Sequence, residues 1–454
     1  MINYLIPAFL VISQLAEFRS NITFFSGNSK KKFYIQDQIL YPAYEGFSVS
    51  RGLNFYNSVF FLLSTPEDQD FQWRLVAEPF FSYPSPDSDP LFLHRFSSKL
   101  RYKFLAIEGG KDTISLGPGV HNSLLLSHNI RPQNFITPKI ENLELPCIGE
   151  FCFGSINFLT GFIFSQDETQ KFANPTFWIM SFSWDILIFH LGASRIIGFG
   201  GKGGWKPKTI KDYFDLFTAK YENAIGTCDW IQDEAEKQKC YDHWIQRDTN
   251  QVAQVFGVIK FSELLQDFFE EFSGYFEYGG DDLVACWQVE DRSIKSCFPL
   301  PFGFTDAAWV VGLQAITHNQ WLFQIEYTWF NKMRKFYAHG NYPMTVKGRY
   351  LGAHSGPLSD DVWIKIAKGI DGFYIGGNFH YTSRWSGLYN IQEKIYEFGL
   401  RFSVDLNGDT NTIGLSPTIY IINNPDVGTN PFEPNFRLGK FVDFSIAFVF
   451  ISRF

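Results

Sequence analysis

Residues 441–454 read FVDFSIAFVFISRF, and this stretch decides the fold. Its even positions from Val442 to Phe450 are all apolar, while its two charges, Asp443 and Arg453, occupy odd positions. Because successive side chains of a strand point to opposite faces, one face is almost wholly apolar. A strand that crosses a bilayer needs about 9–11 tilted residues, with one face toward lipid and the other toward the lumen. The stretch therefore predicts a membrane-spanning β-strand; a buried strand of a soluble protein is the alternative.

The composition favours a barrel and excludes a bundle of membrane helices. The 454 residues include 51 Phe, 21 Tyr and 12 Trp, yet the mean hydropathy is only −0.11. No apolar run reaches the ~18 residues that a membrane helix requires. Strands that alternate apolar and polar residues give a lipid face without a high mean hydropathy. The net charge of −8 argues against a nucleic-acid partner and against a polybasic membrane-surface binder.

The cysteines predict short disulfide-closed loops. There are six, and they fall into pairs close in sequence: Cys147 with Cys152, Cys228 with Cys240, and Cys286 with Cys297. No pair makes a CxxC motif and no His lies at zinc-finger spacing, so an oxidising compartment is the natural interpretation. The pairing is inferred from proximity alone.

The first residues resemble a secretory signal. Residues 4–12 are mostly apolar and are followed by polar Ser13 and Gln14 and by the small Ala16. We therefore predict a signal peptide over residues 1–16 and a single barrel domain over residues 17–454. A basic n-region and a small-x-small cleavage site are lacking, so a first buried strand or helix is the alternative.

The rest of the chain repeats the alternation. It predicts an all-β, transmembrane, antiparallel, up-and-down β-barrel of about 16–18 strands, with long extracellular loops and a small helical excursion. Residues 109–151 are difficult to assign. The expected strands are 54–64, 71–83, 97–108, 152–165, 177–185, 186–195, 252–263, 271–279, 308–317, 321–330, 361–367, 371–383, 396–406, 412–422 and 441–454.

Counting strands backward from a periplasmic C-terminus assigns each connection to a side of the membrane. Short turns at 318–320, 368–370 and 407–411 then fall inside. The long connections fall outside, as expected of such barrels; they are 196–251, 280–306, 331–360, 384–390 and 423–437. This count also places the Cys228–Cys240 and Cys286–Cys297 pairs on the extracellular side.

Signals of enzymatic chemistry are weak. Residues 198–203 match GxGxxG, but Gly204, Trp205, Lys206 and Pro207 follow instead of a helix, so a flexible loop is favoured. Asp405, Asn407 and Asp409 have calcium-loop spacing, but Ser416 stands where a glutamate is required, so a hairpin turn explains them better. Four carboxylates occupy inward strand positions, where barrels keep solvated charge: Glu326, Glu397, Asp405 and Asp443. We predict no catalytic residues, no cofactor and no metal.

Several blocks, in order along residues 105–365, resemble the capsule assembly Wzi family of outer-membrane proteins. The first contains Leu116, Gly117, Pro118 and Gly119, followed by Ser127, Asn129, Arg131 and Pro132, with Leu116 where the family usually has tryptophan. The second contains Arg195, the glycine cluster 198–204, Asn250 and Gln251. The third contains Glu326, Gly352, His354, Asp360 and Asp361.

The resemblance implies an outer-membrane barrel of about eighteen strands that acts as a surface lectin and not as an enzyme. Such a protein helps capsular or related exopolysaccharide to assemble on the cell and adhere to it. The chain departs from the family at its front, because only about thirty residues separate the expected signal from the first expected strand. Each motif also has a structural interpretation: the glycines set a turn, Arg131 and Arg195 pair with lumen carboxylates, and Asn129, Asn250 and Gln251 cap irregular backbone.

Three functions compete at this point. The first is a polysaccharide-binding barrel, the second is a porin or substrate-specific channel, and the third is a lumenal enzyme. A plug formed by residues 109–151 or 196–251 would block conduction and favour the first. Expected partners are the outer-membrane bilayer, an acidic capsular or exopolysaccharide, and the barrel assembly machinery during insertion. We expect the polymer to bind loop 331–360, which combines Lys335, Lys347 and Arg349 with Tyr337 and Tyr350.

Overall fold

The structure of the protein is a computed structural model. The described residues run from 13 to 453 and leave out 31–32, 35–47, 50, 67–68, 85–89, 150, 219, 221–227, 229–230, 245–246, 282, 286–301, 305, 332–335, 340, 386–390, 407–410 and 427–434. Cys286, Cys297 and Lys335 lie outside the described residues, as do residues 1–12 of the expected signal.

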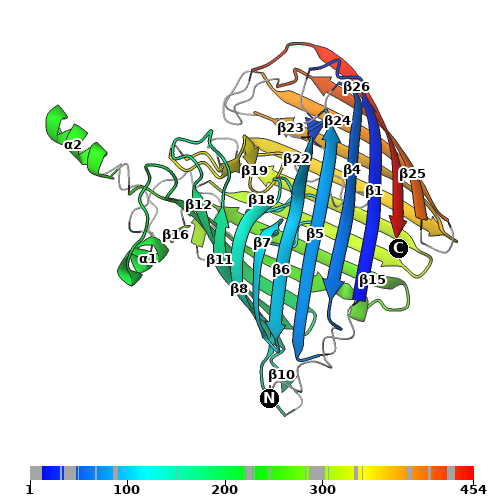
Figure 1. The fold of residues 1–454 in the computed structure, drawn as a ribbon, viewed down its shortest axis with the longest axis horizontal. Coiled ribbons are helices and arrows are strands. Elements are labelled where there is room, and N and C mark those ends of the chain that lie inside the picture. The colour runs from blue at the N-terminus through cyan, green and yellow to red at the C-terminus, as the bar shows by residue number, and fades with distance from the viewer. Residues whose placement is uncertain are drawn as a thin grey trace.

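Eighteen strands form one closed antiparallel sheet, which confirms the predicted barrel (Figure 1). The barrel closes where β1 pairs with both β26 and β4, and each other strand pairs with its neighbours along the chain. The barrel strands are β1 (Ser13–Phe25), β4 (Gly52–Ser64), β5 (Phe71–Tyr83), β6 (Leu91–Tyr102), β7 (Leu105–Asp112), β8 (Gln133–Glu144), β11 (Ser155–Phe164), β12 (Thr176–Ile186), β13 (Phe189–Phe199), β14 (Asn250–Lys260), β15 (Phe269–Gly280), β18 (Ala308–Thr317), β19 (Trp321–Phe330), β22 (Ser359–Ile370), β23 (Phe373–Arg384), β24 (Glu393–Leu406), β25 (Asn411–Asn423) and β26 (Lys440–Arg453).

The remaining elements are short and lie in the connections. Four two-stranded ribbons pair β2 (Phe33–Tyr34) with β3 (Ser48–Val49), β9 (Cys147–Ile148) with β10 (Phe151–Cys152), β16 (Leu283–Ala285) with β17 (Phe302–Phe304), and β20 (Thr345–Val346) with β21 (Arg349–Tyr350). The helical pieces are α1 (Ile210–Phe217), α2 (Glu234–Trp244) and the 3-10 turn η4 (Phe261–Glu263). Among the described residues, no helix combines the length and apolar character needed to cross a membrane.

The side chains alternate between the two faces of the wall as the sequence predicts. On the outside, Leu400 is 53% exposed and Phe448 is 57% exposed, as expected of a surface that lipid covers. Inward positions of the same two strands include buried charged side chains, such as Arg401 of β24 and Asp443 of β26. Asp443 accepts a hydrogen bond from the hydroxyl of Ser26 at 2.9 Å and thereby fastens the turn that follows β1 to the last strand.

Strand β1 is the main difference from the expectation. Ser13–Ala16, which we expected to end a signal, lie in β1 and pair with residues 61–64 of β4. The strand keeps Glu17 and Arg19 inside and Ile22 outside, which is the same alternation that identifies the other strands. The alternative of a first strand therefore applies from residue 13, and the first barrel strand comes earlier than residue 54.

Three further strands differ from the expected ranges or were not assigned. The expected strand 97–108 is a hairpin of β6 and β7 that turns at Lys103, where φ is 54°. The apolar pattern runs through this turn without a Gly or Pro, so periodicity alone does not reveal it. Strand β8 lies within the region that was difficult to assign, and β22 extends through residues 368–370 before it turns at Asp371 and Gly372.

The connections divide as predicted between the two ends of the barrel. Short connections lie at the end where the chain terminates, and long ones lie at the other end, which carries α1 and α2 (Figure 1). Long loops face outward in outer-membrane barrels, so that end is extracellular. Cys228–Cys240 bridges the extracellular connection between β13 and β14, with an S–S distance of 2.02 Å. Cys147–Cys152 closes the β9–β10 ribbon at the periplasmic end.

Candidate functional site

Two connections turn back into the barrel and form a lumenal plug, which we define as residues 113–132 and the described part of 336–358. Leu124, Leu125 and Leu126 are completely buried or nearly so. They share one core with Val252 and Val310, which point inward from β14 and β18. The core of this barrel is therefore inside the lumen, against the wall from β8 to β19, and loop hydrophobics supply half of it.

The second part of the plug packs on the first. Tyr337 and Tyr350 are 1% and 3% exposed and stack with ring centroids 5.5 Å apart. The hydroxyl of Tyr337 donates a hydrogen bond to the carbonyl oxygen of Leu124, and Ser127 N–H donates to the carbonyl of Leu351 at 3.0 Å. Burial raises the pKa of the Tyr350 hydroxyl to about 12, so it stays protonated at neutral pH.

Two lumen carboxylates hold the plug by its backbone. Glu326 of β19 accepts hydrogen bonds from the N–H groups of Val120 at 2.8 Å, His121 at 3.0 Å and Asn122 at 2.6 Å. Glu277 of β15 accepts from Gly119 at 2.8 Å and from Leu124 at 2.7 Å. Successive N–H groups make a concavity that suits carboxyl oxygens, and here a side chain of the barrel wall occupies it. We expected Glu326 to be a solvated charge in the lumen. It is instead buried and anchors the plug to β19.

The glycines of the first motif are required by this close approach. A Cβ on Gly119 would lie 1.7 Å from the carbonyl oxygen of Asn122, and one on Gly117 would lie 2.3 Å from Glu277 Oε1. Gly117 also has a φ of 106°, which L side chains rarely adopt. Pro118 stands between them. These residues do set a turn, and that turn presents the backbone to the carboxylates.

The first and third motifs meet in space. Ser127 Oγ donates to the carbonyl of Gly352 at 2.7 Å, and Asn129 Nδ2 donates to the carbonyl of Tyr350 at 2.9 Å. Arg349 donates in turn to Asn129 Oδ1 at 2.6 Å. Residues more than two hundred positions apart in sequence therefore fasten the two halves of the plug together.

The residues of the second motif make contacts on both faces of the barrel wall. Asn250 points inward and donates to the carbonyl of Tyr342 at 2.8 Å. Arg195 points outward, contrary to our expectation of a lumen carboxylate partner: it donates to the carbonyl of Phe217 at 2.6 Å and to Gln251 Oε1. Its position on β13 has the parity of Leu191, which is exposed on the outer face. Arg195 and Gln251 thus hold the end of α1 against the outer wall.

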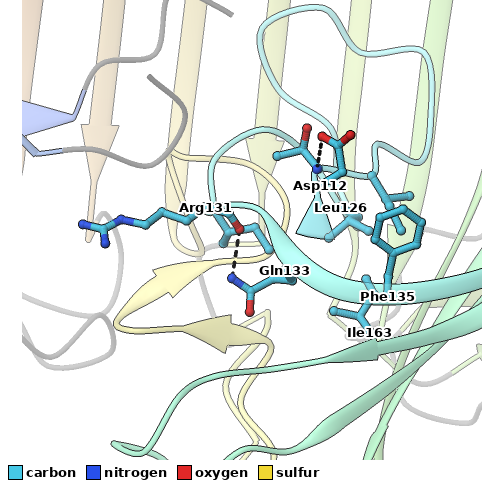
Figure 2. Close-up of a pocket in the computed structure, with 9 residues that line it drawn as sticks. Asp112, Leu126, Arg131, Gln133, Phe135 and Ile163 are labelled. Carbon is cyan, nitrogen blue, oxygen red and sulfur yellow. Dashed lines mark hydrogen bonds between the residues drawn. The ribbon is translucent and has the colours of Figure 1, made fainter. Parts of the chain in front are cut away.

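A small pocket lies beside Arg131 and Gln133, where the plug joins β8 (Figure 2). It has about 220 Å³ of space that protein atoms do not fill, part of it open to solvent. Gln133 Nε2 donates to the carbonyl of Arg131 at 2.9 Å, and Figure 2 shows the Arg131 side chain extending away from Phe135 and Ile163. Ligand pockets usually reach 300–1,000 Å³, so this one is too small for an oligosaccharide.

Three histidines and a carboxylate meet where the plug touches β22 and β23. They are His121, His354, Asp361 and His380, and their ligating atoms all lie within 4.8 Å of one another. Burial and the neighbouring histidines hold the pKa of His121 well below its ordinary value, and burial lowers that of His354. The motif residue Asp360 points elsewhere and accepts from the Tyr327 hydroxyl at 3.1 Å.

A family model described as capsule assembly protein Wzi matches residues 42–361, which is more than two thirds of the chain. The protein belongs to the Wzi family. None of the curated proteins matches it. As a Wzi-family barrel, the chain resides in the bacterial outer membrane.

Solved structures show the same fold at low identity. Wzi from Escherichia coli, described as a carbohydrate-binding β-barrel involved in group 1 capsule assembly, aligns with a TM-score of 0.61 and 15% identity over 99% of this chain and 86% of that one. OpdQ from Pseudomonas aeruginosa aligns with a TM-score of 0.51 and 9% identity over 98% and 97% of the two chains. OpdL from the same organism has a TM-score of 0.51 and 11% identity over 98% of both chains.

The Wzi-family barrel does not expose most of the residues that we expected to bind polysaccharide. Tyr337, Tyr350 and Arg349 are buried in the plug because loop 331–360 folds inward over the apolar wall instead of projecting into solvent. Lys347 is exposed, and Lys335 is outside the described residues. The sequence gives no periodic signal for this inward fold.

Exposed lysines do gather at the extracellular end, and we call them the basic rim: Lys171, Lys202, Lys206 and Lys347. Backbone contacts bring Lys202 and Lys347 to the connection between β11 and β12, which carries Lys171. Lys202 N–H donates to the carbonyl of Ala173 at 2.7 Å, and Lys347 N–H donates to Asp167 Oδ2 at 2.5 Å. The glycine cluster 198–204 makes this packing possible, because a Cβ on Gly204 would lie 1.9 Å from the carbonyl oxygen of Gly200.

Proposed function

We propose that this Wzi-family barrel binds an acidic capsular or related exopolysaccharide at its extracellular end and helps to assemble and attach that polymer at the cell surface. The observation that carries the proposal is the lumenal plug. Five backbone N–H groups of residues 119–124 are anchored on Glu277 and Glu326, so the plug is built into the wall. A barrel whose lumen is filled in this way can bind a polymer on its extracellular surface but gives a solute no open path through the lumen.

The basic rim supplies the chemistry for an acidic polymer. Lys347 is the one residue of our expected set that is both described and exposed, and Lys171, Lys202 and Lys206 extend the positive surface beyond it. Ammonium groups form charge-assisted hydrogen bonds with the carboxylates of uronic acids. Because the rim is exposed, these contacts should weaken as salt screens them. The net charge of −8 makes this local concentration of lysines stand out from the rest of the chain.

The test compares two triple variants. Lys171→Ser, Lys202→Ser and Lys347→Ser together remove most of the basic rim, while Lys103→Ser, Lys260→Ser and Lys368→Ser remove the same charge from the periplasmic end. Purified barrels in nanodiscs are titrated with capsular polysaccharide extracted from the producing cells. We expect the rim variant to bind about tenfold more weakly and to lose much of its salt dependence, since three exposed pairs contribute about 0.2–1 kcal/mol each. Equal affinity in the two variants would refute the rim as the binding surface.

A substrate-specific channel is the second candidate, because an eighteen-stranded barrel is wide enough to enclose an aqueous path where no segment fills it. Its test is conduction through the barrel in planar bilayers, which the plug should prevent. We infer no catalytic activity, and we expect the barrel assembly machinery to act as a partner only during insertion.

A further inference from the structure

The cluster of His121, His354, Asp361 and His380 joins three parts of the molecule. His121 belongs to the first half of the plug, His354 to the second half, and Asp361 and His380 to β22 and β23. Its atoms converge on one point: His121 Nε2 lies 3.3 Å from His380 Nε2 and 3.6 Å from Asp361 Oδ1. His354 Nε2 and His380 Nε2 lie 3.5 Å and 2.7 Å from Asp361 Oδ2.

Hydrogen bonds do not satisfy every ring nitrogen of this cluster. His354 Nε2 is directed at the cluster from a side chain that is only 9% exposed, yet it has no hydrogen-bond partner of good geometry. The Nε2 atoms of His121 and His380 face each other, so one must lack a proton for the other to donate. Buried polar atoms normally find partners, and three converging imidazole nitrogens around one carboxylate call for a cation that accepts all of them.

The ligand set and spacing fit a tetrahedral transition-metal ion. Zinc takes His nitrogen and carboxylate oxygen at about 2.0–2.2 Å in tetrahedral sites, which places ligand atoms roughly 3.3–3.6 Å apart. Three of the four separations above fall at that spacing, measured to one or the other oxygen of Asp361. The His380–Asp361 contact is shorter and the four ligating atoms spread over as much as 4.8 Å, so the side chains must shift to close around an ion. We propose that His121, His354, Asp361 and His380 form a structural binding site for Zn²⁺ or a similar divalent transition-metal ion.

Other side chains contact the four ligating residues and orient them, as is common around metal sites. Asn122 Nδ2 donates to Asp361 Oδ1 at 3.2 Å, and Thr382 Oγ1 donates to Asp361 Oδ2 at 2.7 Å. On the far side of its ring, His380 Nδ1 lies 3.6 Å from Glu397 Oε2. The His121 ring stacks on Trp363 with the centroids 4.9 Å apart and the planes 5° from parallel. The ion would link both halves of the plug to the wall.

The experiment uses the full barrel purified in detergent, stripped with a chelator and titrated with Zn²⁺ or Co²⁺. We expect about one ion per chain, a visible Co²⁺ spectrum of tetrahedral intensity, and X-ray absorption from imidazole nitrogens around Zn²⁺. We expect His354→Ala to lower the affinity at least tenfold. His190→Ala is the matched control, because His190 also pairs with a carboxylate, Asp185, at 2.8 Å but lies apart from the plug.

Two results with the wild-type barrel would overturn the site. One is the absence of stoichiometric Zn²⁺ or Co²⁺ binding by the folded wild-type barrel. The other is an X-ray absorption spectrum without imidazole ligands, which needs no variant and decides the matter if His354→Ala does not fold. Folding is judged by heat-modifiable gel mobility. Binding that His190→Ala and His354→Ala weaken equally would also contradict the assignment.

Discussion

Glu326 on β19 accepts a hydrogen bond of 2.6 Å from the backbone N–H of Asn122, a residue 204 positions earlier in the chain. The same carboxylate also accepts from Val120 and His121. These contacts fasten the plug to the barrel wall. Breaking them is costly, because no water would replace Glu326 as the acceptor of the buried N–H groups.

Replacing Glu326 by Ala should loosen the plug. Three backbone N–H groups and the Tyr275 hydroxyl, which donates to Glu326 at 2.8 Å, would lose their acceptor. Each unsatisfied buried group costs about 1–3 kcal/mol, so the unfolding temperature should fall and a protease should cut residues 113–132. Glu141→Ala is the control, since Glu141 pairs with Lys99 at 2.7 Å away from the plug. Equal protease sensitivity in both variants would contradict the anchoring role.

The plug should prevent conduction. Replacing residues 114–131 by a Gly/Ser segment of equal length removes Leu124, Leu125 and Leu126 from the lumen. The second half of the plug then loses the core on which it packs, so part of the lumen should open to water and conduct. Single-channel recording in planar bilayers measures this. The same replacement over residues 234–244, which form α2 outside the lumen, should leave the barrel closed. A wild-type barrel that conducts as well as the plug variant would favour the channel function.

The lipid face should reject charge while the lumen face accepts it. Leu400→Arg and Phe448→Arg place a guanidinium on the exposed outer wall and should each cost about 2–4 kcal/mol near the bilayer midplane. Ser403→Arg and Ser445→Arg lie at inward positions of the same two strands and should cost little. Refolding into lipid vesicles gives the free energies. Similar losses at all four positions would be incompatible with the assigned faces.

The two disulfides should react from opposite sides of the membrane. In a background with Cys286→Ser and Cys297→Ser, mild reduction followed by an impermeant maleimide should label Cys240 on intact cells, because Cys228–Cys240 lies in the extracellular connection between β13 and β14. Cys147 and Cys152 are exposed in the β9–β10 ribbon at the periplasmic end, so they should react only after the outer membrane is permeabilised. The reverse order of labelling would invert the topology.

The alternation of apolar and polar residues predicts the strands of the barrel wall but not the plug inside the lumen. Strands such as β24 and β26 could be read directly, because a lipid face requires an apolar residue at every second position. The plug has no such period, and its anchors Glu277 and Glu326 lie more than 150 residues from the backbone that they hold. Tyr337 and Tyr350 were expected at the surface because loops normally lie there, and only the tertiary structure shows an apolar lumen wall for them to cover. His121 was missed because its partners come from three distant segments.

The last prediction concerns Arg195 and the helix that it holds. Its guanidinium donates to the carbonyl of Phe217 at 2.6 Å and lies 5.6 Å from the Phe217 ring, so it fixes the C-terminal end of α1, where the helix carbonyls lack partners. Leu216 is the buried apolar residue of α1, and it packs on Ile197 of the outer wall. Arg195→Ala should therefore release α1 without affecting the lumen, and hydrogen exchange should show its amides losing protection by about tenfold, as the loss of a charged hydrogen bond of about 1.5–3 kcal/mol allows. Lys211→Ala, on the exposed side of the same helix, should change nothing. Slow exchange of α1 in both variants would mean that Leu216 and its apolar contacts suffice to dock the helix.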